Sequence, residues 1–517
     1  MIWLIAKKEF LLNLISARFI IGFMLCLVVI PFTLVVGVDH YKDRVRVYRV
    51  FEKEVENAQN DIRVYSQVRP EIVIPPEPLS IFSRGISDNI GNRVKIQLGE
   101  YPLFPSRHTA TRDNPLLNAF FSIDFATVIA ILMSLLALVF AYDVFTNERE
   151  NGTLKAAFAN GVSRTAYLTG KLLGIVVTLV PILLFCFLLG VLVIALSPAV
   201  HFNAGDWGGV ALLFFSSLLY MAVFILLGMF ISSMSQRSST SIIISLLCWI
   251  WLLFLTPNIA SYTAQSFVKT EMYDNVQFVL NDFDNQYWTE YREKRETLSN
   301  ELGSVNFAYM NSASNPDGVF ITTGTERLTF EFHRQFNMWQ EPTRIDYADK
   351  KWAVQKKYLD DLAHQEKVRG YLSWLSPAGI FEQITDIQCR SGLASFHRLM
   401  EHVRVYRENV IRYFIDKKLF ESYSYFTPQP ESSFPEAIDW EGIIETFQRT
   451  GVFETPDEWN PTTYPTLNLD DVPVFEYRSA TVGASLNASM GRMAGMLALC
   501  LLLLGATMFS FIKYDVR

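Results

Sequence analysis

The chain has 517 residues, of which 50% are hydrophobic and 19% are charged, and its formal net charge is −7. This length excludes a single ordinary globular domain, and the charged fraction excludes a chain built only of membrane helices. The acidic balance gives no reason to expect a nucleic-acid partner.

The N-terminal residues 1–38 predict an interfacial helix followed by a first membrane span. Hydrophobic residues between Trp3 and Leu14 favour an amphipathic helix at the membrane surface. Charges at Lys7 and Glu9 argue against a cleavable signal peptide. Residues 19–38 carry no charge and are numerous enough to cross the hydrocarbon layer as a helix.

Residues 39–117 are polar and are expected to form a first extracytoplasmic insertion. The insertion opens with helical spacing, since Tyr41, Val45, Tyr48 and Val55 fall on one face. Prolines between residues 70 and 96 exclude a helix there, so short extended pieces are expected.

Spans two to five are expected within residues 118–257. Uncharged runs lie at 125–142, 172–200, 207–236 and 238–268, and we expect the chain to leave the membrane after Pro257. The link 201–206 has no Lys or Arg, whereas segment 143–171 has several. The positive-inside rule therefore places 143–171 and both termini in the cytoplasm.

Residues 258–484 predict a large, mainly helical extracytoplasmic domain. One long helix is indicated by apolar residues in alternating steps of three and four, interrupted at Lys417. They are Phe396, Leu399, Val403, Tyr406, Val410, Tyr413 and Phe420. A weaker helix is indicated around Tyr358, and loops with short strands are expected over 456–474.

Residues 485–517 supply a sixth span at 493–512 and a cytoplasmic C-terminus. Four of the five cysteines lie inside uncharged runs, so no disulfide framework is expected. The expected fold class is thus an α-helical polytopic membrane protein with six transmembrane helices and a large, mainly helical extracytoplasmic domain.

Segment 143–171 is the polar stretch between spans two and three. Asn151-Gly152 predicts a break, after which 153–160 can form about two helical turns with Leu154 and Phe158 on one face. Gly161 is expected to end that helix, and Ser163 to cap the next one. These residues alone leave two interpretations open: an ordinary loop, or a docking helix on which a cytoplasmic partner pushes.

Three strings in this segment carry a resemblance to a known family: E-R-E-N-G-T-L at 148–154, V-S-R at 162–164 and G-K at 170–171. Together they resemble the cytoplasmic coupling segment of type-2 ABC exporter permeases. Gly161 stands where that family commonly has Pro. P-L-S-I-F-S-R-G at 78–85, L-S-P-A-G-I-F at 375–381 and the final Y-D-V-R resemble the branch with large extracytoplasmic insertions.

The resemblance implies that 143–171, here called the coupling segment, docks on a separate ABC ATPase subunit in the cell (inner) membrane. The implied ATPase-coupling residues are Glu148, Arg149, Glu150, Gly152, Thr153, Leu154 and Arg164. Glu148 is the first choice because its carboxylate can pair with a basic group on the partner. Gly152 is the second, because a side chain there would restrict the break. A second permease copy or a related permease is also implied.

No motif for catalysis is present. The phosphate loop G-x-x-x-x-G-K-[ST] is missing, so ATP and Mg are expected on the partner ATPase, with no cofactor in this chain. His397 and His402 are five residues apart and do not share a helical face, so no metal site is expected. No ionisable group lies in the middle of a span, which argues against proton-driven transport.

Three functions remain open at this point. The first is a permease that couples ATP hydrolysis by a separate subunit to export or extraction of a substrate. The second passes ATP-driven motion to an extracytoplasmic partner protein without transport. The third is an unrelated membrane receptor or scaffold. The similarity to the coupling segment favours the first two, and the sequence does not choose between them.

Overall fold

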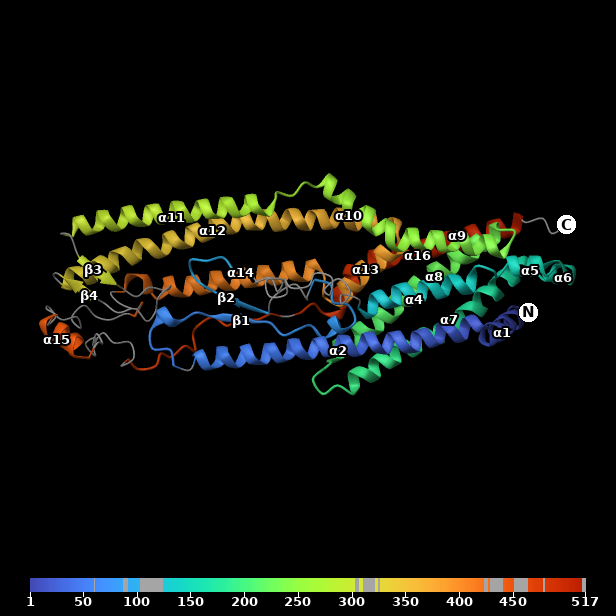
Figure 1. Cartoon of the computed structure of the whole chain (residues 1–517), viewed down its shortest axis with the longest axis horizontal. Helices are drawn as coiled ribbons and strands as arrows, with labels where there is room; N and C mark the ends of the chain where they lie inside the picture. Colours follow the sequence, from blue (N-terminus) through green and yellow to red (C-terminus); the bar gives the residue numbers. More distant parts are fainter. Residues whose placement is uncertain are drawn as a thin grey trace.

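The computed structural model is an elongated, mostly helical molecule, with a helical bundle at one end and long helices extending from it (Figure 1). It describes residues 1–59, 61–86, 92–102, 124–302, 306–309, 321–323, 326–422, 426–427, 440–450, 464–477 and 479–513. Parts of both expected insertions and the final string Y-D-V-R therefore lie outside the described residues.

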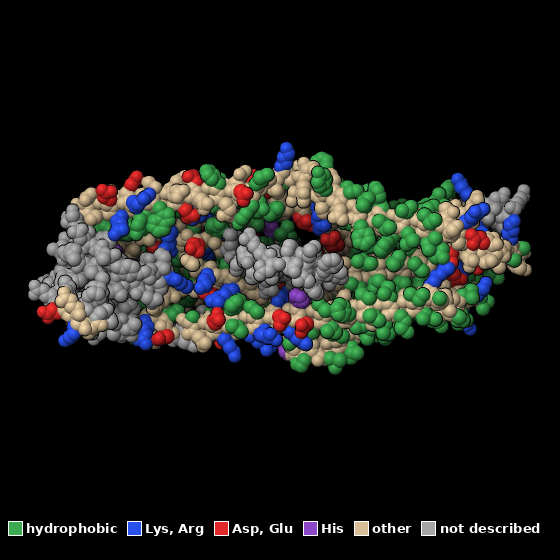
Figure 2. Space-filling model, in the orientation of Figure 1, with side chains coloured by type: hydrophobic (Ala, Val, Ile, Leu, Met, Phe, Trp, Pro, Cys, Tyr) green, Lys and Arg blue, Asp and Glu red, His purple; other side chains and the backbone are tan. Residues whose placement is uncertain are grey.

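Within the described residues, six helical stretches are long and apolar enough to cross a membrane, which confirms the expected number of spans. They are Ala17–Ala58, Phe125–Glu150, Arg164–Ala195, Ala204–Met234, Ser238–Phe267 and Val482–Lys513. In the same order they correspond to α2 (Ala17–Gln59), α4 (Phe125–Ala141) with its continuation, α7 (Arg164–Ala195), α8 (Ala204–Met234), α9 (Ser238–Ile250) with its continuation, and α16 (Val482–Lys513). Hydrophobic side chains cover much of the face of this bundle that is seen in Figure 2.

The spans are unequally covered by their neighbours. The most apolar window of 125–150 is 61% buried within the chain, whereas that of 238–267 is only 11% buried. Helix α4 is therefore central, and its Ile129 and Met133 are fully buried together with Ile30 and Leu34 of α2. The α9 stretch lies at the periphery, where lipid or another chain can cover it.

Three helices extend further than the hydropathy pattern predicts. Helix α2 continues through Pro31 to Gln59, and α16 begins at Val482 rather than at 493. Helix α9 passes through a π-helical segment (Trp251–Leu255, η5) into α10 (Thr256–Phe267), so Pro257 does not end the helix. A proline is tolerated there because it stands in the first turn of α10. Hydropathy marks the lipid-facing length of a helix, and polar residues continue it beyond the lipid.

The part of the chain beyond the bundle is mainly helical, as expected. Helices α11 (Tyr273–Glu301) and α12 (Glu326–Leu372) lie side by side, and α13 (Pro377–Gln388) packs against α8 and α16 (Figure 1). Helices α14 (Leu393–Asp416) and α15 (Trp440–Thr450) follow. The 3₁₀ segments in this part are Tyr65–Gln67 (η1), Pro78–Ile81 (η2), Ser373–Leu375 (η6) and Leu419–Glu421 (η7).

Two short antiparallel strand pairs confirm extended pieces in the proline-rich region and add one beyond it. Strand β1 (Glu71–Val73) pairs with β2 (Arg93–Lys95), and Ile72 lies opposite Val94. Strand β3 (Asn306–Tyr309) pairs with β4 (Ile321–Thr323). Ile72 and Val94 are both buried in a second hydrophobic core, which they share with α14.

Helix α14 buries the seam that the sequence spacing predicted. Val403, Tyr406 and Val410 are buried in the second core. The helix ends at Asp416 with Lys417 as its C-cap, so Phe420 lies in η7 instead of one turn further along α14. Lys417 is thus the end of the helix and not an interruption within it.

Candidate functional site

The coupling segment lies at the end of the bundle opposite to α11 and α15, next to α1 and the end of α16 (Figure 1). A turn at 142–145 leads into α5 (Thr146–Glu150), and α6 (Thr153–Ala159) follows. Gly152 and Gly161 both have left-handed φ angles, of 69° and 76°, at the two ends of α6. The Ser163 hydroxyl accepts from the Ala166 amide, so the predicted break, short helix and cap are confirmed.

Glu148 belongs to a buried ionic triad with Glu9 and Lys171. The Lys171 Nζ lies 2.7 Å from Glu9 Oε2 and 2.9 Å from Glu148 Oε1. The three side chains are only 6%, 11% and 15% exposed for Lys171, Glu9 and Glu148. The structure therefore gives Glu148 a basic partner within its own chain, where the sequence analysis expected one on the ATPase.

The triad depends on close packing between α1 (Ile2–Ile15) and α7. A Cβ added at Gly174 would lie 2.5 Å from Glu9 Cβ, and one at Gly170 would lie 2.8 Å from Ile5 Cβ. Glycine at these two positions lets the helices approach, which brings Glu9 to Lys171. The expected interfacial helix is thus packed along α7, with Ala6 and Glu9 buried and Trp3 exposed.

Arg149 and Glu150 connect α5 to the junction between α8 and α9. Arg149 Nη1 donates to the Ser235 carbonyl over 2.6 Å, and Nη2 donates to the Ser233 carbonyl over 2.8 Å. The Glu150 carboxylate accepts from the Ser238 amide over 2.8 Å and from its hydroxyl over 3.0 Å. A cation at the C-terminus of α8 and an anion at the N-terminus of α9 are each favourable, because they satisfy end groups that a helix leaves unpaired.

Arg164 makes the equivalent connection from α7 to α16. Its Nη1 donates to the carbonyls of Phe511 and Ile512, over 3.1 and 2.5 Å. Phe511 also packs against Phe158 and Tyr167, with ring centroids 5.9 and 6.0 Å away. Leu154 is buried on the same side of α6. The apolar face predicted from Leu154 and Phe158 therefore packs onto the bundle.

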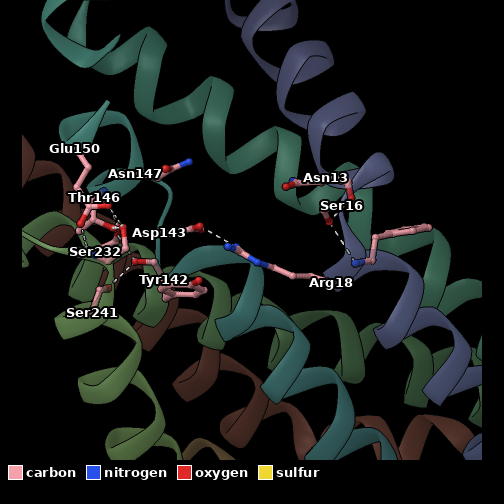
Figure 3. A network of polar contacts seen from close by, with 12 residues as sticks. Asn13, Ser16, Arg18, Tyr142, Asp143, Thr146, Asn147, Glu150, Ser232 and Ser241 are labelled. Atoms are coloured by element: carbon pink, nitrogen blue, oxygen red, sulfur yellow. Dashed lines mark hydrogen bonds and ion pairs between the residues drawn. The ribbon is translucent and has the colours of Figure 1, made fainter. Parts of the chain in front are cut away.

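A further polar network, which the sequence analysis missed, holds the turn before α5 (Figure 3). Arg18 of α2 donates to Asp143 over 2.8 Å, and its guanidinium lies 5.0 Å from the ring centroid of Tyr142. Ser232 accepts from the Phe145 amide, and Ser241 donates to the Tyr142 carbonyl. The sequence placed Asp143 at the edge of a span but offered no spacing rule that could pair it with Arg18.

One face of the segment stays open to solvent. The exposed residues of the segment are Asn147, Glu150, Asn151, Gly152, Thr153, Lys155, Ala156, Ala159, Asn160, Gly161, Ser163 and Thr165. Thr153 donates to the Glu148 carboxylate, which connects this exposed face to the ionic triad. Among the implied coupling residues, Gly152 and Thr153 lie on the open face, while Glu148, Arg149, Leu154 and Arg164 contact the bundle. Glu150 does both, because it is exposed and also binds Ser238.

The polar side chains of the segment are engaged in contacts with the bundle. Within the described ranges, no group of three or more His, Cys, Asp or Glu side chains could hold a metal ion. His402 is exposed, and its Nδ1 lies 2.7 Å from the Arg398 carbonyl of its own helix. The side chains of the segment instead bind the ends of neighbouring helices.

The comparisons with known proteins agree with this geometry. The family model described as ABC-2 family transporter protein matches residues 3–387, which include the interfacial helix, the coupling segment and five of the six spans. A comparison with curated proteins finds no match. On the extent of the family match, together with six spans and a short helical segment packed across their ends, the chain belongs to the ABC-2 family of transporter proteins.

Proposed function

We propose that the chain is the permease subunit of an ATP-driven transporter, whose separate ATPase subunit binds the open face of α5 and α6 on the cytoplasmic side of the cell (inner) membrane. The observation that carries this proposal is the division of the coupling segment into two faces. One face binds the ends of several helices, and the other presents uncovered polar side chains. A partner that moves the open face therefore moves the helix ends with it.

The connections give the motion defined routes into the membrane. Glu148 pairs with Lys171 of α7, and Lys171 in turn pairs with Glu9 of α1. Arg149 and Glu150 lead to the junction of α8 and α9. The contacts of Glu148 and Arg149 are short and partly or fully buried, whereas those of Glu150 are exposed. Displacing α5 without displacing its neighbours would leave the buried charged groups unpaired, which is costly.

The sidedness follows from the charge pattern and from the common location of the ends. Helix α1 and Lys513 of α16 lie at the same end of the molecule as α5 and α6 (Figure 1). Because Lys and Arg are concentrated on the cytoplasmic side of membrane proteins, this end is proposed to be cytoplasmic. The long helices α11, α12 and α14 then face the extracytoplasmic side.

A second copy, or a related permease, is proposed to complete the transport path. The α9 stretch leaves large apolar side chains such as Leu247 and Trp251 exposed by 63% and 55%. Family membership implies an ABC ATPase partner and a paired permease. The path for an exported or extracted substrate would then lie between the two permeases.

One observation favours the alternative in which ATP-driven motion is passed to an extracytoplasmic partner. Helix α2 runs unbroken from the bundle into the outer part of the molecule, so displacement at one end reaches the other. Family membership weighs against the third interpretation, a membrane receptor or scaffold.

The proposal is tested by purifying the tagged chain from its own host in mild detergent, identifying co-purified subunits by mass spectrometry and measuring vanadate-sensitive ATP hydrolysis. Lys155→Glu reverses a charge on the open face and is expected to reduce both readouts by tenfold or so, because a desolvated docking contact contributes about 1–3 kcal/mol. Lys357→Glu, an equally exposed change on α12, is the matched control. Absence of an ATPase from the parent preparation, or its full retention by Lys155→Glu, would reject the docking face.

A further inference from the structure

The part of α2 beyond the bundle carries four cations on one face. Lys42, Arg46, Arg49 and Lys53 follow one another in steps of four, three and four residues, which places them in a single row along a helix. We call this row the cationic face. It lines a groove of about 550 Å³ together with Val45, Val50 and Ala199, the last from the link between α7 and α8.

Among the described residues, the cationic face forms one ion pair. Arg46 pairs with Asp43 over 3.3 Å, but both side chains are more than 60% exposed. The one carboxylate that lines the groove, Glu52, accepts from the Tyr48 hydroxyl over 2.6 Å. Within the described part of the chain, no carboxylate forms an ion pair with Lys42, Arg49 or Lys53.

Toward the N-terminus of α2, the same row continues as an apolar stripe. Met24, Val28 and Val35 precede Lys42 along the helix at compatible spacing, and they are 54%, 65% and 55% exposed. Since α2 crosses the membrane, these side chains face its hydrocarbon layer. Lys42 follows the last residue of the uncharged run by four positions, and the other three cations continue the row away from the membrane. On one face, helix α2 is therefore apolar within the membrane and cationic in the part that extends beyond it.

We propose that the cationic face binds the phosphate headgroup of an anionic membrane lipid, whose acyl chains lie along the apolar stripe. The inference rests on α2 spanning the membrane and not on the proposed ATPase, and it concerns the leaflet opposite the coupling segment. Lys and Arg supply several donors to a phosphate, and Val45 and Val50 contact the adjoining apolar groups. A row of this kind matches the two-part chemistry of a lipid.

A second copy of the chain is a poorer occupant of this face. In a symmetric dimer an interface uses the same patch on both subunits, so α2 against α2 would place Lys42, Arg46, Arg49 and Lys53 opposite their own copies. Like charges brought together in this way are unfavourable. The exposed α9 stretch carries no such row, which leaves it free for the paired permease.

The test uses the full chain in nanodiscs of phosphatidylcholine with a minor fraction of phosphatidylglycerol. Electron paramagnetic resonance of spin-labelled phosphatidylglycerol, compared with spin-labelled phosphatidylcholine, reports which lipid is immobilised at the protein surface. The parent chain is expected to prefer phosphatidylglycerol by about threefold or more, because each Lys or Arg near an anionic surface contributes on the order of a fivefold gain. Raising the salt concentration should weaken the preference.

The triple variant Lys42→Gln, Arg49→Gln, Lys53→Gln is expected to lose the preference while keeping the parent's thermal unfolding temperature. Arg49 and Lys53 are exposed, Lys42 is half-buried, and none of the three forms an ion pair within the described residues. The matched control removes the same charge from exposed positions on α12 and α14, through Lys350→Gln, Lys357→Gln and Arg412→Gln. This control is expected to keep the preference for phosphatidylglycerol.

Three results would overturn the proposal: no preference in the parent, an unchanged preference in the first variant, or an equal loss in the control. Displacement of the labelled lipid by soluble glycerol phosphate at similar concentration would show a site for free phosphate instead of lipid. Each of these results can occur while ATPase binding remains intact, so the test is independent of the proposed function.

Discussion

The Lys171 ammonium lies 2.7 Å from the Glu9 carboxylate, although 162 residues separate the two in the sequence. Glu148 completes the triad from the coupling segment at 2.9 Å. One cation is thus shared by two carboxylates in a place that excludes most of the solvent. Three elements of the bundle, α1, α5 and α7, depend on this one ammonium group.

Lys171→Met is therefore expected to destabilise the chain by about 3 kcal/mol or more, because it leaves two buried carboxylates without a cation. Thermal unfolding in detergent, followed by intrinsic fluorescence, measures the effect. Lys155→Met, at an exposed lysine of the same segment, is the control and is expected to change stability by no more than about 0.5 kcal/mol.

Combining Lys171→Met with Glu9→Gln and Glu148→Gln is expected to recover most of the loss, since the triple variant buries no unpaired charge. Glu148→Lys should destabilise more than Glu148→Gln, because it places two ammonium groups together. A Lys171→Met chain as stable as the parent would show that the triad contributes nothing.

Gly152→Ala is expected to cost about 1 kcal/mol, and Gly152→Asn clearly less. The reason is the backbone alone: φ is 69°, and an added Cβ would meet nothing within 4 Å. Asparagine enters the left-handed region more readily than alanine. Equal unfolding temperatures for the Ala and Asn variants would contradict this explanation. Gly483, in a helix with equally open surroundings and no positive φ, is the control position, where Ala should be tolerated.

The membrane part of this fold could be predicted from sequence, while the contacts of the coupling segment could not. Uncharged runs predict spans because lipid accepts few charges, and the turn at Gly152 and the cap at Ser163 are local features. The pairing of Glu148 with Lys171 and Glu9 depends instead on how α1 packs on α7. Gly170 belongs to the G-K string that resembles the family. That a glycine there lets Ile5 of α1 approach closely is visible only in the structure.

Asp386 is expected to make the stability of the outer part depend on pH. Burial raises its pKa to about 7, with further contributions from Glu382 and Asp124 that Arg369 opposes. Its carboxyl is thus protonated in the folded chain at pH values where the unfolded chain has lost that proton. Stability should therefore fall by about 1–3 kcal/mol as the pH rises from about 4 to above 7.

Asp386→Asn removes this titration, so stability should depend less on pH between about 4 and 7. The variant is expected to raise the unfolding temperature at pH 8 more than at pH 5. The amide keeps an acceptor for the Ser83 hydroxyl, which lies 3.4 Å from Asp386 Oδ1. Glu401→Gln, at an exposed carboxylate of α14, serves as the control. A profile that Asp386→Asn leaves unchanged would assign the pH dependence to another group.

The proposed sidedness predicts opposite labelling of Lys155→Cys and Lys357→Cys in a background without the five native cysteines. In cells with an intact cell membrane, a membrane-impermeant maleimide should label position 357 once any envelope layer outside that membrane has been made permeable. It should label position 155 only after the cell membrane itself is disrupted. Both positions are exposed, so access and not burial decides the result. Labelling of 155 but not 357 in intact cells would invert the topology.

Helix α2 is long enough to connect the two ends of the molecule. Its 43 residues extend for about 65 Å without a break. A tilt of about 5° around its midpoint would move each tip by about 3 Å, and in opposite directions, for a rod of this helical length. Arg18, near the inner tip, is bound to Asp143 beside the coupling segment, and Lys53 is near the outer tip. For a rigid helix that pivots in this way, a displacement of the end that carries Arg18 would appear at the Lys53 end with equal amplitude and reversed direction.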